Sequence, residues 1–356
     1  MKLTNDSAIV KFFNKLVSPQ SQILGILAVA SIAIILGVIP YKRFMSLEPE
    51  TQVVPVTPEF IKEWGNVPTR VTVGLYINGF PSLDFVNNEF VFDGILWFEF
   101  DPALISLNTV SKFSLEGGEI LKQSEPYTQV IDNRFFARYI IQGKFKADLD
   151  YKLFPFDDHR LDIILANRSI QPSEMIFRAY ASYFVIPPTV KFIGWNIWDL
   201  SVRSGMSESV LNKYESQKVV AYPRVVFSIF LRRSGVRNMF LILLPLFLIY
   251  FISLFSFAFD PETHPGTIFG IASAGVTSLL SYRFVIENMT PKVGYFVLSD
   301  HLFVVFLGAA LIEFIFAVVL MRSEKMTPTT SIARGIIYIL INVVFLCFWG
   351  YFLLNI

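Results

Sequence analysis

The most specific chemistry in this chain belongs to a carboxylate, Asp157, at the end of a Phe-Pro-Phe-Asp run. Pro155 lacks a backbone donor and turns the chain, and the phenyl rings on either side give the turn an apolar tip. A carboxylate at such a tip is costly to bury unless a cation pairs with it. Arg232 and Arg233 stand shortly before a long apolar stretch. We expect one of these two arginines to be the partner of Asp157.

Signatures of enzymes are missing from the sequence. The three histidines, His159, His264 and His301, do not stand at metal-ligand spacing with Cys or carboxylates. The sequence has no Gly-Lys-Ser/Thr phosphate loop and no Gly-x-Ser-x-Gly elbow. Its single cysteine, Cys347, excludes a disulfide within the chain. We therefore expect no enzyme, no catalytic residue, no metal site and no cofactor, and the net charge of +1 gives no indication of nucleic-acid binding.

The composition indicates a membrane protein, because 53% of the residues are hydrophobic and only 17% are charged. A helix needs about 20 apolar residues to cross a bilayer, where each backbone polar group must be satisfied internally. Five stretches are apolar over about this length: 23–39, 238–259, 265–286, 302–321 and 335–355. The last four are joined by short links, which predicts a four-helix transmembrane bundle over residues 234–356.

Basic residues beside the spans indicate the orientation. The leader, residues 1–22, has three lysines against one aspartate, and the connector after the fourth span has three basic residues against one acid. Such flanks favour the cytoplasm. We expect an uncleaved N-terminal transmembrane helix at 23–40, a cytoplasmic N-terminus, and residues 41–237 and the C-terminus on the opposite side. A cleaved signal peptide is the alternative for the first span.

The region between the first and second spans has the pattern of a β-domain. Short runs of β-branched and aromatic residues, bounded by Gly, Pro and Asn, predict an antiparallel β-sandwich over residues 67–233. These runs include 70–77, 90–100, 139–145, 160–165 and 219–231. Residues 41–66 are rich in Pro, Glu and Thr and predict a linker with one short helix near 58–64. The predicted fold class is therefore an extracytoplasmic β-sandwich, a four-helix bundle and one N-terminal anchor helix.

An ordered set of motifs over about residues 67–356 resembles the pentameric ligand-gated ion channels, the Cys-loop receptor family. The motifs are Val-Gly-Leu-Tyr-Ile at 73–77, Asp-Gly-Ile-Leu-Trp at 93–97, the Phe-Pro-Phe-Asp run, the Arg-Arg pair, Pro245, and Met-Thr-Pro-Lys-Val-Gly-Tyr at 289–295. Ala147 and Leu161 stand at the two positions that are Cys in animal receptors, which is similar to the prokaryotic branch. His159 stands where Gln is usual, and the N-terminal helix is extra to the ordinary plan.

This resemblance implies a ligand- or proton-gated ion channel subunit in a bacterial inner membrane. The implied partners are identical subunits in a homopentamer, membrane lipids, permeating ions, and an unknown small ligand or protons. The implied pore-lining residues recur at helical spacing in the second pore-domain span: Gly270, Ala274, Thr277, Ser281, Phe284 and Val285. Tight helix packing without a pore remains the alternative for these small residues.

The same resemblance implies a junction that couples ligand binding to helix tilt. Its residues are Asp84, Pro155, Asp157, Arg232, Arg233, Pro291 and Lys292. An Asp–Arg pair with two arrangements could transmit the change, and a static salt bridge is the alternative. Leu is usual at the family's central gate where this chain has Thr277, and ion selectivity is left unassigned. Arg283 and Glu287, four residues apart, are candidates for an intrahelical pair.

Two further expectations concern polar groups in unusual places. Tyr214 and Tyr222 lie in the late hairpin where family members bind agonist, so their rings are candidates to hold a cation, although one wall of the family's site is missing. Glu313 lies deep in an apolar span, which favours either a proton-sensing role or a neutral, hydrogen-bonded carboxyl. A non-conducting sensor or accessory scaffold is the alternative function, and the extra N-terminal helix favours it.

Overall fold

The computed structural model describes residues 8–42, 48–85, 87–211, 219–234, 237–322 and 327–354. The chain divides into two compact units. The helical unit contains Met1–Met45, Tyr151–Asp157 and Gly235–Ile356, and the β-rich unit contains Ser46–Asp150 and Asp158–Ser234. The predicted linker therefore belongs in part to the β-rich unit. Seven residues from the middle of the predicted β-domain belong to the helical unit.

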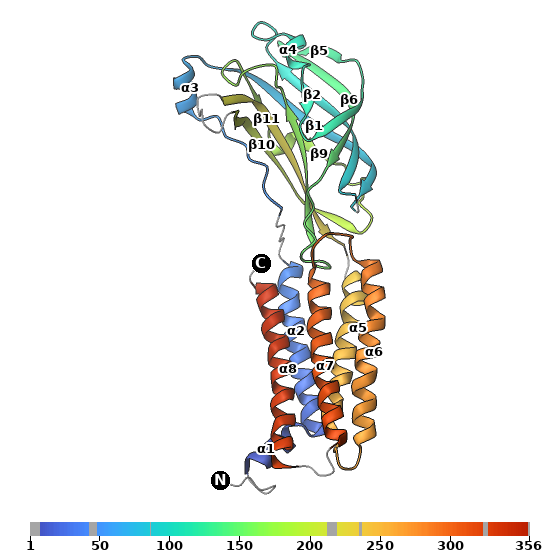
Figure 1. Cartoon of the computed structure of the whole chain (residues 1–356). Helices are drawn as coiled ribbons and strands as arrows, with labels where there is room; N and C mark the ends of the chain where they lie inside the picture. Colours follow the sequence, from blue (N-terminus) through green and yellow to red (C-terminus); the bar gives the residue numbers. More distant parts are fainter. Residues whose placement is uncertain are drawn as a thin grey trace. The chain divides into compact units, whose positions relative to one another are not determined.

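Five long helices run through the helical unit (Figure 1). They are α2 (Pro19–Lys42), α5 (Arg237–Leu254), α6 (Pro265–Met289), α7 (Leu298–Arg322) and α8 (Pro328–Leu354), with a short α1 (Ala8–Leu16) and a 3₁₀ turn, η2 (Phe255–Ala258). All five are long and apolar enough to cross a membrane. This confirms the five predicted apolar spans and a membrane protein that carries a β-domain.

Proline marks the beginning of three of these helices, since it fits the first turn, where its missing N–H is not needed. Pro19, Pro265 and Pro328 are the first residues of α2, α6 and α8. Pro291 fixes the end of α6, because the residue before a proline avoids helical geometry. Accordingly, Thr290 is extended, with φ −83° and ψ 139°.

The N-terminal helix α2 packs along α8. The indole N–H of Trp349 in α8 donates a hydrogen bond of 2.9 Å to the carbonyl of Ala33 in α2. Glycines allow the close approach: a Cβ on Gly25 would lie 2.8 Å from the Tyr338 hydroxyl, and one on Gly37 would lie 3.6 Å from the Trp349 ring. The extra helix is thus an integral part of the helical unit.

The β-rich unit contains two sheets. The larger has the order β4-β6-β2-β1-β8, with β5 on β6 and β9 on β1, and the smaller has the order β10-β11-β7-β3. Their strands are β1 (Thr69–Asp84), β2 (Glu89–Phe100), β3 (Ser114–Leu115), β4 (Gly118–Gln123), β5 (Tyr127–Ile131), β6 (Arg134–Lys146), β7 (Asp158–Ala166), β8 (Met175–Arg178), β9 (Phe184–Val185), β10 (Trp195–Val210) and β11 (Val219–Arg233). Each of the five runs predicted as strands lies within one of them.

The core of this unit follows the two-residue period of the strands. Alternate residues of β2 are buried from Phe90 to Phe100, and so are Leu161, Ile163 and Leu165 of β7. The rings of Phe184 in β9 and Phe227 in β11 lie 5.2 Å apart, so the two sheets share buried contacts. Two short helices border the sheets: α4 (Leu107–Val110) and α3 (Pro58–Trp64), the latter confirming the short helix predicted near 58–64.

Gly143 tests the packing of this core. A Cβ there would lie 2.5 Å from the ring of Phe92 and 2.6 Å from a methyl group of Leu115. We expect Gly143→Ala to lower the free energy of unfolding of the β-rich unit by about 1–3 kcal/mol, because overpacking forces its neighbours to shift. Gly79→Ala in β1 is the matched control, since no atom lies within 4 Å of its Cβ position. Thermal unfolding followed by tryptophan fluorescence measures both; equal stability of the two variants would contradict the packing described.

Candidate functional site

The Phe-Pro-Phe-Asp loop, residues 151–157, is a buried part of the helical unit. Two tight turns shape it: Phe154 N–H donates to the Tyr151 carbonyl at 2.9 Å, and Phe156 N–H donates to the Leu153 carbonyl at 2.8 Å. The bond between Phe154 and Pro155 is cis. The side chains of Tyr151, Leu153, Phe154 and Phe156 are all at least 92% buried. The predicted apolar tip is therefore packed inside protein.

This loop contacts the beginning of α7 and the end of α8. The Leu298 N–H at the start of α7 donates to the Lys152 carbonyl at 2.8 Å, and the Tyr295 hydroxyl accepts the Tyr151 N–H at 2.9 Å. The ring of Phe156 lies 6.3 Å from that of Trp349 in an edge-on arrangement. A displacement of the loop would therefore directly disturb its contacts with α7 and α8.

The two arginines predicted at the junction, Arg232 and Arg233, both have partners within the β-rich unit. Arg232 Nε lies 3.7 Å from Oδ2 of Asp158, the residue after the predicted partner, and its guanidinium lies 3.7 Å from the ring centre of Trp198. Arg233 lies 4.3 Å over the ring of Trp195. Asp157 is itself 1% exposed. Asp158 and Arg232 face each other across β7 and β11. The pairing expected between Asp157 and one of the two arginines stays a prediction.

Other residues predicted at the junction form hydrogen bonds within their own turns or are exposed. Asp84 accepts hydrogen bonds from the backbone and side-chain amides of Asn87, at 3.0 and 2.7 Å, and so folds the turn between β1 and β2. The carbonyl of Pro291 accepts the Val293 N–H at 2.9 Å, and Lys292 is exposed. These residues shape turns beside their respective strands and helices.

His159, where the resembled family has Gln, is fully buried and pairs with Glu48. Its Nδ1 lies 2.9 Å from Glu48 Oε1, and the other carboxylate oxygen, Oε2, accepts the Arg160 N–H at 2.6 Å. Phe85 stacks on the imidazole at 5.8 Å, and Trp195 lies 4.9 Å from it. Sequence reasoning missed Glu48. A buried imidazole needs a polar partner. The signal available in the sequence was therefore His159 together with the acidic residues of the preceding linker.

Glu48 begins a strap, residues 48–54, that crosses the outer face of the four-stranded sheet. Its backbone and side chains bind residues of β7, β10 and β11. The contacts are Pro49 O with Arg160 Nη2 at 2.6 Å, Glu50 with Arg203 at 2.6 Å, Thr51 with Asp162 at 2.7 Å, Gln52 O with Arg224 at 2.8 Å, and a two-bond bridge between Val54 and Met206 at 2.9 and 3.0 Å. The segment expected to be a linker is therefore bound in place.

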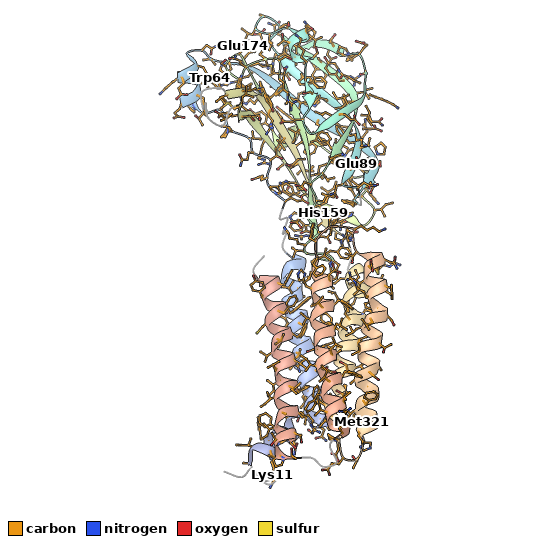
Figure 2. The ribbon with its side chains drawn as sticks, viewed as in Figure 1. Lys11, Trp64, Glu89, His159, Glu174 and Met321 are labelled. Carbon is orange, nitrogen blue, oxygen red and sulfur yellow. The ribbon has the colours of Figure 1, made fainter. Side chains whose placement is uncertain are left out.

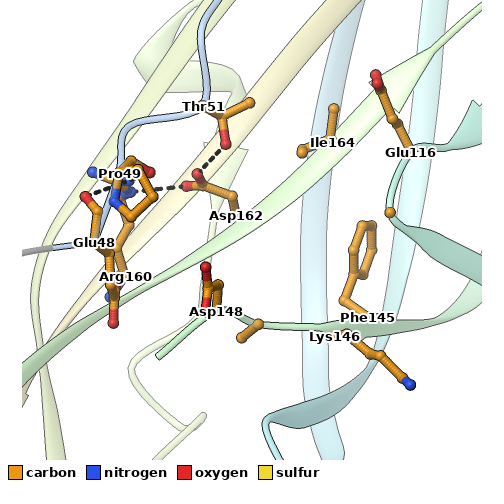
Figure 3. A pocket seen from close by; sticks show the side chains of 12 residues that line it. Glu48, Pro49, Thr51, Glu116, Phe145, Lys146, Asp148, Arg160, Asp162 and Ile164 are labelled. Atoms are coloured by element: carbon orange, nitrogen blue, oxygen red, sulfur yellow. Dashed lines mark hydrogen bonds and ion pairs between the residues drawn. The ribbon is translucent and has the colours of Figure 1, made fainter. Parts of the chain in front are cut away.

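A pocket of about 170 Å³ lies between the strap and the sheet (Figure 3). Four carboxylates line it, those of Glu48, Glu116, Asp148 and Asp162, together with the cations of Lys146 and Arg160. Asp162 is already bonded by Thr51 and by the Ser228 hydroxyl at 2.6 Å. Across the described ranges, no group of three or more His, Cys, Asp or Glu side chains is placed to hold a metal ion. The pocket is below the size of ordinary small-molecule sites and suits bound water.

Tyr222, one of the two predicted ligand-binding tyrosines, already has partners. Its hydroxyl donates to Glu116 at 2.9 Å, and the guanidiniums of Arg168 and Arg224 lie 5.4 and 6.0 Å from its ring centre. Only 8% of the residue is exposed. The structure thus uses this ring for packing and for cation–π contacts with the protein's own arginines. Tyr214 lies outside the described residues.

The helix α6 has one exposed and one buried side. All six residues predicted to line a pore are exposed in the single chain: Gly270, Ala274, Thr277, Ser281, Phe284 and Val285. The buried positions, Ile268, Ala272, Gly275, Leu279 and Ile286, alternate with them at helical spacing. Thr277 donates to the Ser273 carbonyl at 3.0 Å, so its hydroxyl proton is satisfied along the helix.

Two ionisable residues of the helical unit, Arg283 and Glu313, were noted in the sequence. The salt bridge of Arg283 differs from the expected one, and Glu313 has unusual surroundings. Arg283 forms its salt bridge with Asp300 at the beginning of α7 rather than with Glu287, and its guanidinium also lies 5.4 Å from the ring centre of Phe303. Glu313 is 2% exposed, and neither carboxyl oxygen has a hydrogen-bond partner among the described residues. The Ser253 hydroxyl of α5 faces this carboxyl.

Comparison with models of known protein families gives no match, and comparison with curated proteins gives none either.

Glu116 tests the electrostatics around Tyr222, because Arg224 donates to both oxygens of its carboxylate, through Nε and Nη2, and the Glu116 side chain is only 16% exposed. Glu116→Gln leaves the buried guanidinium without a counter-charge, and we expect a loss of roughly 3 kcal/mol in the free energy of unfolding. Glu99→Gln is the control, since its pair with Arg134 is 36% and 42% exposed and should contribute under about 1 kcal/mol. Urea unfolding of both variants gives the comparison, and a small loss at both positions would refute the assignment.

Proposed function

We propose that this chain is a subunit of a ligand- or proton-gated ion channel, in which ions flow passively through a homopentameric pore lined by α6. The observation that carries the proposal is the two-sided character of α6. Its residues with the family's pore-facing spacing are all exposed, and the opposite side is buried against its own unit. On this proposal the two sheets form the family's β-sandwich, and α5 to α8 form its four-helix bundle.

The contacts of the helical unit supply a route for gating. The loop at 151–157 lies in sequence between β6 and β7, and its Lys152 carbonyl is bonded to Leu298 at the start of α7. Two residues later, Asp300 is held by Arg283 of α6. On this proposal, a shift of the loop displaces α7 through the hydrogen bond between Lys152 and Leu298. The salt bridge between Asp300 and Arg283 passes the displacement on to α6. Rigid shifts of packed helices of this kind are an established switching mechanism.

The proposed ion path is narrow and almost free of charge. Small residues line most of its length, and Phe284, 70% exposed, is the largest apolar side chain among the predicted pore residues. Five such rings around an axis would form a constriction from which water withdraws, which is one way in which pores close. Accordingly, Phe284 with Val285 is the proposed gate, in place of the family's central Leu.

The proposed location is a bacterial inner membrane, with the N-terminus in the cytoplasm and the β-rich unit and the C-terminus outside it. The distribution of basic residues beside the spans supports this orientation. A non-conducting sensor or accessory scaffold is the second candidate, and the packing of α2 along α8 favours it, because an added helix per subunit provides additional surface for a partner.

Accessibility of α6 tests the pore. In a Cys347→Ser background, we expect cysteines at Gly270, Thr277 and Ser281 to react with a membrane-impermeant, water-soluble thiol reagent, because that side would face an aqueous path. Cysteines at Ala272 and Leu279, which are fully buried, are the controls and should stay unmodified. Equal protection at all five positions would favour tight packing without a pore.

Bilayer recordings across pH and ionic gradients test conduction and the gating route together. We expect Arg283→Gln and Asp300→Asn to change open probability at least several-fold, with little further change in the double variant, because both break one link. Glu287→Gln, an exposed carboxylate one turn along α6, is the control. Wild-type gating in both single variants would contradict the proposed gating route through Arg283 and Asp300. If the intact native pentamer gave no current under any condition, the result would favour the non-conducting sensor or accessory scaffold.

A further inference from the structure

The helix α1, formed by residues expected to be a simple leader, has three distinct sides. At 100° per residue, Val10 and Phe13 fall on one side, Ile9 and Phe12 on the next, and Lys11 and Lys15 on the third. A soluble surface helix needs only an apolar and a polar side. The additional apolar side of α1 needs a separate explanation.

The first side packs against protein. Val10 is 1% exposed and Val17, just after the helix, is fully buried. Gly335 in the second turn of α8 makes room for Phe13, since a Cβ at Gly335 would lie 2.3 Å from its ring. These contacts hold α1 at the beginning of α8 (Figure 1).

The second side is apolar and uncovered by the described protein. Phe12 is 61% exposed and Ile9 is 53% exposed, although both are large hydrophobic residues. Only Val17 and Ser18 separate α1 from α2, whose span begins at Pro19. Lys11 also lies at the same end of the helical unit as Met321, near the end of α7 (Figure 2). The exposed side chains of Phe12 and Ile9 therefore lie at the level where the membrane spans end.

The third side is basic. Lys11 and Lys15 are four residues apart and both exposed, and the described helix carries no acidic residue. A basic strip beside an apolar strip, at the end of a membrane span, matches the boundary between acyl chains and anionic headgroups.

We propose that α1 is an interfacial helix that binds the surface of the bilayer. Phe12 and Ile9 enter the acyl region, and Lys11 and Lys15 bind anionic lipid headgroups. The partner is the leaflet that lies at the beginning of α2. The negative charge of its headgroups complements the positive charge of the two lysines. This inference depends on the membrane spans and does not require channel activity.

Depth measurements test the placement of α1. The full-length protein carries nitroxide labels at Ile9→Cys, Phe12→Cys or Asn14→Cys in a Cys347→Ser background, in nanodiscs of phosphatidylcholine and phosphatidylglycerol. Labels at positions 9 and 12 should collide preferentially with oxygen, and the label at 14, on the polar side, with a water-soluble nickel chelate. Preferential collision with the nickel chelate at all three positions would show a helix in water and overturn the proposal.

Lipid choice tests the role of the lysines. Native mass spectrometry of the full-length protein from these nanodiscs gives the retained ratio of phosphatidylglycerol to phosphatidylcholine. The double variant Lys11→Gln/Lys15→Gln should lower this ratio about fivefold for each lysine removed. Lys62→Gln/Lys112→Gln, which removes two exposed lysines of the β-rich unit, is the matched control and should leave it unchanged. An unchanged ratio in the first variant would exclude headgroup binding by α1.

Discussion

The side chain of Trp349 connects the parts of the helical unit that sequence places farthest apart. Its indole N–H bonds the Ala33 carbonyl of α2 at 2.9 Å, while its ring contacts Phe156 of the loop and Phe247 of α5, at 6.3 and 5.6 Å. A buried indole donor needs an acceptor, and the Ala33 carbonyl lies within hydrogen-bonding distance of it. The extra N-terminal helix provides one. Docking of α2 and placement of the loop therefore depend on the same residue.

In the β-rich unit, the buried imidazole of His159 requires a polar partner, which is Glu48. The imidazole of His159 is buried between Phe85 and Trp195 and has the carboxylate of Glu48 as its partner. Glu48 reaches it because the strap is bound along its length to β7, β11 and β10. The strap also forms one wall of the charged pocket. The N-terminal extension is thus built into both units, by Ala33 in one and by Glu48 in the other.

Features that depend on repeating patterns were accessible from the sequence, and features that depend on register were not. Hydrophobic length predicted the five spans, and alternation predicted β1, β2, β6, β7 and β11. The position of Arg232 opposite Asp158 across two strands could not be predicted, because periodicity does not fix the register between strands. Glu48 and Glu116 come from a linker and a turn distant in sequence from His159 and Tyr222. The exposed lysines of α1 were counted for orientation, but nine residues were too few to predict a separate helix.

The composition of α6 argues that a single chain is incomplete. The hydroxyls of Ser273 and Thr277 donate to helix carbonyls, at 3.1 and 3.0 Å, so these two do not by themselves require water. The small side chains beside them, however, give little contact area to lipid tails, and α6 has a mean hydropathy of 1.4, against 2.3 to 2.8 for the other four spans. A helix gains from such a face when other helices approach closely or when water enters between them. On the proposed function the approaching helices are further copies of α6, and the large exposed ring of Phe284 opposes their close approach at its own level. Copies arranged around an axis, apart enough to admit these rings, leave a path between the small residues, and this geometry favours the pore over the packed bundle.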